Sequence, residues 1–271
     1  SSPKGTTKRR KTGKSGKASA FGRTSRGVYL SAQKTGFYST HNSYEFTWVF
    51  WRRREPWNPT VDLPLRRIGN PVPMYAREFF NTILPEATLT EGGVGYDLLV
   101  GDWVEPHGKG TVKDMVFSLK RNYVESRDFE AELRITMPNP GDGFSPISPE
   151  EILEGSELPL PPTAHEEGYV PSLVLVQEIQ PRVRPMTNTV EPKANSFFLR
   201  VRTQLGPDGK VESAMYGKLV GPFSWYVHGT TTAVIDTTYY YVNPDGTRNV
   251  EFDPKRNLLQ GLRSSERPDK P

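Results

Sequence analysis

The residues with the clearest chemical potential form a basic cluster near the start of the chain. Six basic side chains fall within ten residues, and Lys4 precedes them: Lys8, Arg9, Arg10, Lys11, Lys14 and Lys17. Crowded lysines and arginines bind phosphates by releasing counterions, without reading base sequence. We therefore predict that residues 1–27 bind nucleic acid or another polyanion. The alternatives are a nuclear-targeting signal or a solubilising tail drawn to anionic surfaces.

The rest of the chain has the opposite charge. Residues 1–44 hold ten basic side chains and no acidic one. The whole chain has 35 basic and 31 acidic residues, so residues 45–271 keep 25 basic and 31 acidic ones, a net charge of −6. A charge split of this kind indicates a partner for the basic segment more than a property of the fold.

Most residue patterns for covalent or metal chemistry are missing from the sequence. There is no cysteine, which removes disulfides, thiol nucleophiles and cysteine-bound zinc. No serine lies in a Gly-x-Ser-x-Gly elbow. The four histidines lie in separate segments without a second ligand at metal-binding spacing: His41, His107, His165 and His228. We therefore expect no metal, no cofactor and no catalytic residue.

A pair of carboxylates is the one enzymatic alternative that the sequence leaves open. Glycoside hydrolysis needs two acids about 5–10 Å apart, a separation that sequence does not reveal. Acidic side chains on or near expected strands are Asp97, Asp102, Glu105, Glu130, Glu132, Asp236 and Glu251. Acids on the solvent face of a strand are the ordinary outcome. Likewise we expect residues 165–167, His-Glu-Glu, to form an exposed acidic loop.

Aromatic side chains gather in the last quarter of the chain. On paired strands Trp225, Tyr239 and Tyr241 would share one face and form a platform for sugar rings or bases. The alternative is that these rings fill the core and cross-strand pairs.

The elements that would position these residues are mostly strands. Residues 195–253 predict two hairpins with the same Pro-Asp-Gly turn, Gly206–Gly209 and Asn243–Gly246. Proline presets φ, aspartate bonds to the local backbone, and glycine accepts positive φ. Further strands are predicted at 27–33, 43–51, 96–104, 112–119, 129–137 and 172–179.

One helix is predicted, over Pro73–Leu84. Proline suits its first turn, and five apolar residues recur at helical spacing: Met74, Phe79, Phe80, Ile83 and Leu84. Residues 138–171 are rich in proline and form the main irregular stretch. Within it, Ser148 and Glu151 have the spacing of a capping box around a single helical turn.

These elements predict a mainly β protein, either an antiparallel β-sandwich or a jelly roll. The 25 prolines and 24 glycines among 271 residues favour many short strands over helices. The expected organisation is a flexible basic arm at 1–27, disordered when alone, followed by a single β-sandwich domain at 28–262. That domain contains the proline-rich insertion 138–171, and residues 263–271 form a polar tail.

No apolar run approaches the roughly 18 residues that a membrane helix requires, so no membrane span is expected. The Ser1-Ser2 start suits removal of either an initiator methionine or a signal peptide. The first would place the protein in the nucleus, the cytoplasm or a virion. The second would place it outside the cell or in the cell envelope.

A Lys/Arg arm at 8–17 followed by a strand-rich body from Gly27 to Asp253 loosely resembles the jelly-roll viral coat proteins. The resemblance is one of architecture, without a specific motif. It implies an arm that neutralises packaged nucleic acid and a body that assembles with its own copies. We therefore expect a non-enzymatic, homo-oligomeric structural protein. The alternative is an exported β-sandwich that binds glycan or envelope components through the Trp225 platform.

Overall fold

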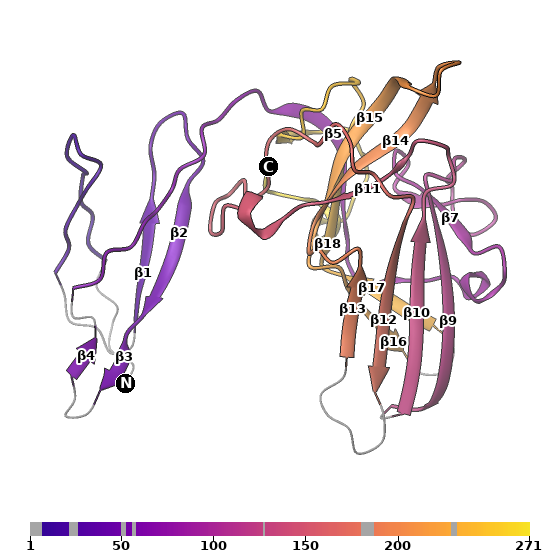
Figure 1. The fold of residues 1–271 in the computed structure, drawn as a ribbon, viewed down its shortest axis with the longest axis horizontal. Coiled ribbons are helices and arrows are strands. Elements are labelled where there is room, and N and C mark those ends of the chain that lie inside the picture. Colours follow the sequence, from indigo (N-terminus) through magenta and orange to yellow (C-terminus); the bar gives the residue numbers. More distant parts are fainter. Residues whose placement is uncertain are drawn as a thin grey trace.

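The computed structural model describes residues 7–21, 27–49, 53–55, 58–126, 128–179, 187–228 and 232–271. The fold is mainly β, as predicted, and consists of antiparallel sheets with one parallel strand pair (Figure 1). Helical structure in the described residues is limited to three short 3₁₀ turns: η2 (Glu86–Leu89), η3 (Pro149–Glu151) and η4 (Ser264–Glu266).

Two six-stranded sheets make up the body. Sheet A has the order β13 (Thr187–Glu191), β12 (Ser172–Ile179), β10 (Asp128–Thr136), β9 (Met115–Glu125), β7 (Val94–Asp97) and β8 (Asp102–Trp103). Sheet B has the order β11 (Gly143–Pro146), β14 (Phe197–Leu205), β15 (Val211–Val220), β18 (Thr238–Asn243), β5 (Val72–Phe79) and β19 (Phe252–Asn257). A smaller sheet joins β16 (Ser224–His228), β17 (Thr232–Asp236) and β6 (Thr82–Ile83).

The main hydrophobic core contains side chains from both large sheets. In β10, Ala131, Leu133 and Ile135 are buried and alternate with more exposed polar residues, as the two-residue period of the strand predicts. They share one cluster with Phe197 and Val242 of sheet B. The burial of these apolar side chains is the main favourable contribution to the free energy of folding.

The proline-rich insertion contributes to a second cluster, on sheet B. Ile147, Leu160 and Ala164 of the insertion cluster with buried sheet B side chains such as Phe198 and Tyr241. The insertion is not featureless, because it contains β11 and the η3 turn. At that turn the Ser148 amide donates to Glu151 Oε2 at 2.9 Å, as the capping-box spacing predicted.

The prediction of a helix over Pro73–Leu84 is wrong. Most of this segment is β5, which pairs with β18 and β19 and has the alternating burial of a strand. Asn81 has φ = 46°, which separates β5 from β6 and which no α-helix contains. Apolar residues at helical spacing were also compatible with alternation, and hydrogen bonding to two neighbouring strands decides for the sheet.

Of the two predicted hairpins, only the first exists. Strands β14 and β15 pair across the Gly206–Gly209 turn, in which Gly209 has φ = 76°. Gly246 in the second turn has φ = 80°, but the strands on either side of it diverge. Strand β18 lies between β15 and β5, and β19 pairs with β5 in parallel. The Pro-Asp-Gly residues form a turn at both positions. Which strands pair on either side of the turn depends on long-range contacts with other strands.

The N-terminal part of the described chain stands apart from the body. Strands β1 (Gly27–Ala32) and β2 (Thr40–Glu45) form an antiparallel hairpin, and β3 (Thr47–Val49) pairs with β4 (Arg53–Glu55). Figure 1 shows this part projecting beside the body. At the opposite end of the chain, the predicted polar tail lies against the body, where Arg77 forms a 2.8 Å ion pair with Glu266.

A cluster of ion pairs links β14 of sheet B to β7 and to the residue before β9 in sheet A. Arg202 donates to Asp114 at 2.9 Å and to Asp97 at 3.0 Å, and both carboxylates are almost fully buried. The Arg202 amide also donates to Asp142. Arg202 holds this position with φ = 54°, a left-handed conformation that side chains rarely adopt. The hydrogen bonds to these three acids hold the backbone of Arg202 in its strained conformation.

Candidate polyanion-binding arm

The predicted phosphate-binding residues lie on an extended segment that folds back on itself. Residues 7–21 contain no helix or strand. The segment turns where the Gly13 amide donates to the Lys17 carbonyl at 3.1 Å, and Gly16 takes φ = 73°. Lys8 donates through Nζ to the Phe21 carbonyl, so the two ends of the segment meet. The result is an open basic loop rather than a regular element.

Every predicted basic residue that the structure describes is exposed. These residues are Lys8, Arg9, Arg10, Lys11, Lys14 and Lys17. Lys4 lies outside the described residues. Because the first 44 residues hold no acid, no carboxylate within this segment competes for these cations. Their charge is therefore available to an external anion.

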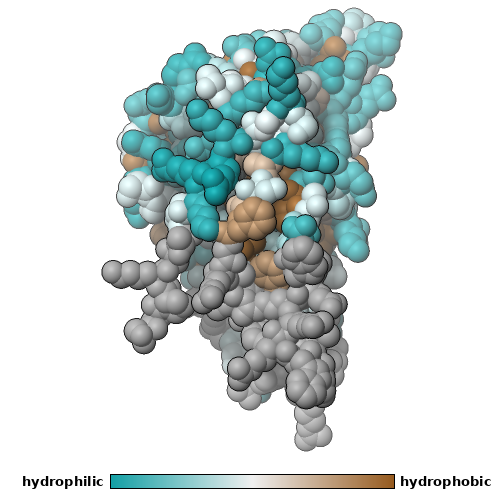
Figure 2. Space-filling view, turned by 90° about the vertical axis from the view of Figure 1, so that its left-hand side faces the viewer, coloured by the Kyte–Doolittle hydropathy of each residue, from teal (hydrophilic) through white to brown (hydrophobic). Residues whose placement is uncertain are grey.

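The β1–β2 hairpin separates the basic loop from the two-sheet body (Figure 1). The loop lies on the side of the hairpin that faces away from the body. Figure 2 views the molecule from this side, and its coloured surface is mostly hydrophilic, with a short hydrophobic strip. A partner approaching this face meets charge and hydrogen-bonding groups. Separation of the positive loop from the net negative body concentrates the positive potential at one end.

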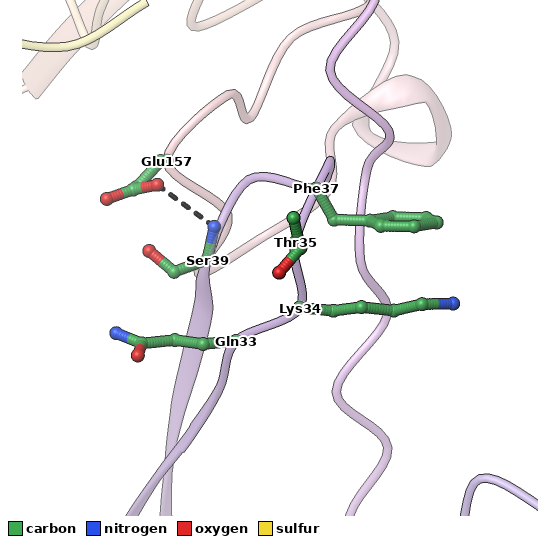
Figure 3. Close-up of a pocket in the computed structure, with 6 residues that line it drawn as sticks. All are labelled: Gln33, Lys34, Thr35, Phe37, Ser39 and Glu157. Atoms are coloured by element: carbon green, nitrogen blue, oxygen red, sulfur yellow. Dashed lines mark hydrogen bonds between the residues drawn. The ribbon is translucent and has the colours of Figure 1, made fainter.

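A shallow depression marks the turn of the hairpin. Its volume is about 340 Å³, and Figure 3 shows the six residues that line it: Gln33, Lys34, Thr35, Phe37, Ser39 and Glu157. Glu157 accepts the Ser39 amide at 2.9 Å, and Lys34 Nζ lies 4.4 Å from the centre of the Phe37 ring. The depression is wide open and its polar groups do not converge. The depression therefore has the geometry of a contact between the hairpin and the insertion, and not the enclosed shape typical of a ligand site.

The hairpin is anchored to the body through a buried glutamate. Glu251 accepts hydrogen bonds from the Tyr38 hydroxyl at 2.7 Å, the Gly69 amide at 2.9 Å and the Asn70 amide at 2.8 Å. Its side chain is 2% exposed. Tyr38 lies just before β2, so this carboxylate holds together the root of the hairpin, the segment leading to β5 and the strand region before β19.

A buried lysine lies in the same region. Lys218 of β15 is 1% exposed, and its ammonium lies 4.7 Å from the centre of the Tyr241 ring. Burial lowers the pKa of Lys218 to about 7, an effect that the nearby Glu251 charge opposes. No sequence pattern marks this lysine, because lysine is ordinarily a surface residue and its burial depends on how β15 packs in the fold. It is linked to the anchor of the hairpin rather than to a cleft.

The predicted aromatic platform does not exist as a surface. Trp225 and Tyr241 are each 3% exposed, and only Tyr239 reaches solvent in part. Trp225 belongs to the main core and Tyr241 to the insertion-covered cluster, so the two rings do not share a face. Trp225 lies on β16, which pairs with β17 rather than β18. The aromatic rings serve as core residues, the alternative that the sequence left open.

The structure brings together one chain of polar side chains that sequence reasoning missed. Ser145 Oγ lies 2.8 Å from His165 Nδ1, and His165 Nε2 lies 2.8 Å from Glu151 Oε1. The hydrogen bond with His165 is the largest cause that lowers the pKa of Glu151, and hydrogen bonds from Ser148 lower it further. A serine, an imidazole and a carboxylate in this order suit nucleophilic catalysis. Ser145 is only 2% exposed, however, so its hydroxyl lies inside the fold rather than in an open cleft.

The hydrogen bonds among Ser145, His165 and Glu151 therefore link three parts of the proline-rich insertion to one another. Ser145 lies on β11, Glu151 on η3 and His165 in the following loop, all within residues 138–171. His165 is half-buried against the Phe198 ring, whereas Glu166 and Glu167 are exposed. Only these two glutamates form the acidic loop that was predicted for residues 165–167.

Within the described residues, no three His, Asp or Glu side chains gather closely enough to bind a metal ion. No helix in that part of the chain has the length and apolar character needed to cross a membrane. No protein-family model, curated protein or solved structure matches this chain.

Proposed function

We propose that this is a non-enzymatic structural or interaction protein whose basic arm binds nucleic acid or another polyanion without sequence specificity. One observation supports the proposal most strongly. The cations of the arm are exposed, lack acids in their own segment and lie on the side of the hairpin that faces away from the body. This arrangement favours long anions, because contacts to several phosphates add up along the arm.

The body in this proposal is a β-sandwich of jelly-roll type that assembles with copies of itself. The sharing of one core by sheets A and B supports the sandwich. The coat-like role adds that the arm neutralises the charge of a packaged polyanion while the body forms the contacts between copies. Sheet edges and proline-rich loops supply those contacts.

Fluorescence anisotropy with a labelled, random-sequence oligonucleotide tests the arm. We expect binding to weaken steeply with salt, with a slope of log K against log salt of about −4 if all six described cations contact a single strand. A variant in which all six become glutamine should lose most of this binding. The positions changed are Lys8, Arg9, Arg10, Lys11, Lys14 and Lys17.

A matched control changes the same amount of charge on the body. It replaces six exposed lysines by glutamine: Lys109, Lys113, Lys120, Lys193, Lys210 and Lys255. This variant should bind the oligonucleotide with a nearly unchanged salt slope. Equal losses in both variants would show that binding reflects total charge rather than the arm, and salt-independent binding would contradict the proposal outright.

A further inference from the structure

One face of the β1–β2 hairpin is open to solvent. Side chains alternate between the two faces of a strand, and residues directly opposite each other on paired strands share a face. By this rule and the register of the pair, the open face carries four exposed side chains: Tyr29, Ser31, His41 and Ser43. The other face is partly covered, and Thr40 on that face is only 1% exposed.

Two aromatic rings stack on this open face. The centres of the Tyr29 and His41 rings lie 5.7 Å apart, and their planes differ by 27°. The Tyr29 side chain is nevertheless 70% exposed, so much of its ring surface remains open. Because Tyr29 lies on a paired strand and stacks on His41, its ring is a fixed surface on which a further planar group can stack.

A second exposed ring lies in the basic loop itself. Phe21 is 75% exposed, and its carbonyl accepts a hydrogen bond from Lys8 Nζ. Among the exposed large hydrophobic side chains of the described residues, Phe21 and Tyr29 have the two highest exposed fractions. Both lie in the stretch of 44 residues that holds ten basic side chains and no acidic one. The first acid, Glu45, lies at the other end of β2 from His41 and has an interaction partner of its own.

Cations beside exposed rings are the combination with which proteins bind unpaired nucleic-acid strands. Lysine and arginine neutralise the phosphates, and bases stack on aromatic rings because every base has a π face. A polyanion without bases, such as polyphosphate, makes no such contact with the rings. In a duplex the bases already stack on one another, so their faces are not available to a protein side chain.

We propose that the arm and the hairpin together bind single-stranded nucleic acid, with bases stacked on Tyr29 and Phe21 and phosphates held by the cations of the arm. The inference deepens the proposed function and rests on it, because the cations must first attract the strand. It selects unpaired strands from the polyanions considered above. Stacking does not read the sugar, so a DNA strand and an RNA strand offer the rings the same chemistry.

Fluorescence anisotropy with the full-length chain and four labelled probes of equal length tests the ligand class. The probes are a thymidine DNA strand, a uridine RNA strand, an abasic DNA strand and a DNA duplex, and the first two distinguish DNA from RNA as the ligand. We expect the better of these two strands to bind at least about tenfold more tightly than the abasic strand, which has the same phosphates without bases. Equal affinity for the abasic strand overturns the inference and leaves polyanion binding intact. Absence of binding to every probe at low salt overturns the proposed function as well.

Substitution of Tyr29 tests the ring. Tyr29→Ala should weaken binding of the unpaired strand about tenfold, because stacking of one base on one ring contributes about that much. The slope of log K against log salt should stay at the wild-type value, since stacking releases no counterions. Tyr29→Val keeps a good strand former without a ring and should lose as much affinity, whereas Tyr29→Trp should bind at least as tightly as wild type.

The matched control is Tyr226→Ala, which removes a 40% exposed tyrosine from β16 of the body and should leave every affinity unchanged. Binding of the abasic strand and of the duplex should be the same in wild type and in Tyr29→Ala. An equal loss on all probes would mean that the ring acts through the structure of the hairpin, which overturns stacking. So would wild-type affinity for the unpaired strand in a variant that combines Tyr29→Ala with Phe21→Ala.

The salt slope separates the rings from the cations. The six-glutamine variant of the arm should have a smaller slope than wild type, whereas Tyr29→Ala should keep the wild-type slope with a lower affinity at each salt concentration. A reduced slope in Tyr29→Ala contradicts the assignment of this ring to the bases. An unchanged slope in the arm variant contradicts the proposed function instead.

Discussion

At the scale of single residues, the two Pro-Asp-Gly turns show how context changes the role of one side chain. Asp208 is mostly exposed and accepts the Lys210 amide at 3.1 Å. Asp245 Oδ1 accepts the side-chain amide of buried Asn243 at 2.8 Å, and both the amide and the hydroxyl of Thr247 at 2.7 Å. The same Pro-Asp-Gly sequence is therefore expected to stabilise the fold to different extents at its two positions.

Replacing these aspartates by alanine should separate the two contexts. Asp245→Ala should lower the free energy of unfolding by about 1–3 kcal/mol, because it leaves the buried Asn243 amide short of an acceptor. Asp208→Ala should leave the urea midpoint nearly unchanged. Urea unfolding followed by circular dichroism measures both, and equal losses would mean that the Asn243 network contributes nothing beyond the turn.

The buried lysine should make stability depend on pH in a definite direction. In the unfolded chain Lys218 keeps its proton up to about pH 10.5, whereas the folded protein releases it above about pH 7. Between these values the unfolded state binds more protons, so stability rises with pH. The rise should be of the order of a few kcal/mol, and Lys218→Met should abolish it.

Urea unfolding at intervals from pH 6.5 to 9.5 measures this rise. The range stops there because burial raises the pKa of Tyr240 and Tyr241, so stability should fall again once unfolded tyrosines ionise. A wild-type stability that is flat or falling between pH 7 and 9.5 contradicts the prediction. So does a rise that Lys218→Met retains.

At the scale of elements, alternation predicted strands well wherever one face packs on the core. Strands β10 and β12 were predicted to within a residue, because their apolar positions repeat every second residue over a full strand. Strand β5 was mistaken for a helix because its apolar residues satisfy both periods. Its assignment depends on β18 and β19, which lie more than 150 residues away in the sequence.

The anchor of the hairpin is an element-scale feature that a single hydroxyl tests. Tyr38→Phe removes the bond to Glu251 and should lower the free energy of unfolding by about 1–2 kcal/mol. Amide hydrogen exchange over residues 27–45 should accelerate more than exchange in sheet A. Tyr29→Phe, which changes an exposed ring, serves as the control and should leave both quantities unchanged.

At the scale of the whole molecule, composition and the alternating patterns of many segments predicted the mainly β fold, and the placement of charges along the sequence separates a basic arm from an acidic body. These properties are sums over many residues, so they survive errors at single positions. The Ser145–His165–Glu151 chain and the burial of Lys218 near the charge of Glu251 were not predictable. They depend on distances set by the packing of an irregular insertion and by the meeting of distant strands.

The left-handed Arg202 has a consequence for how this sequence can change over time. Its backbone favours glycine, yet glycine would leave the buried carboxylates of Asp97 and Asp114 without their counter-charge. Neutralising either acid first would leave a strained arginine with less to hold it. Each single substitution therefore lowers the stability of the fold. The effects of changes at the three positions depend on one another, so related chains should keep or lose all three together.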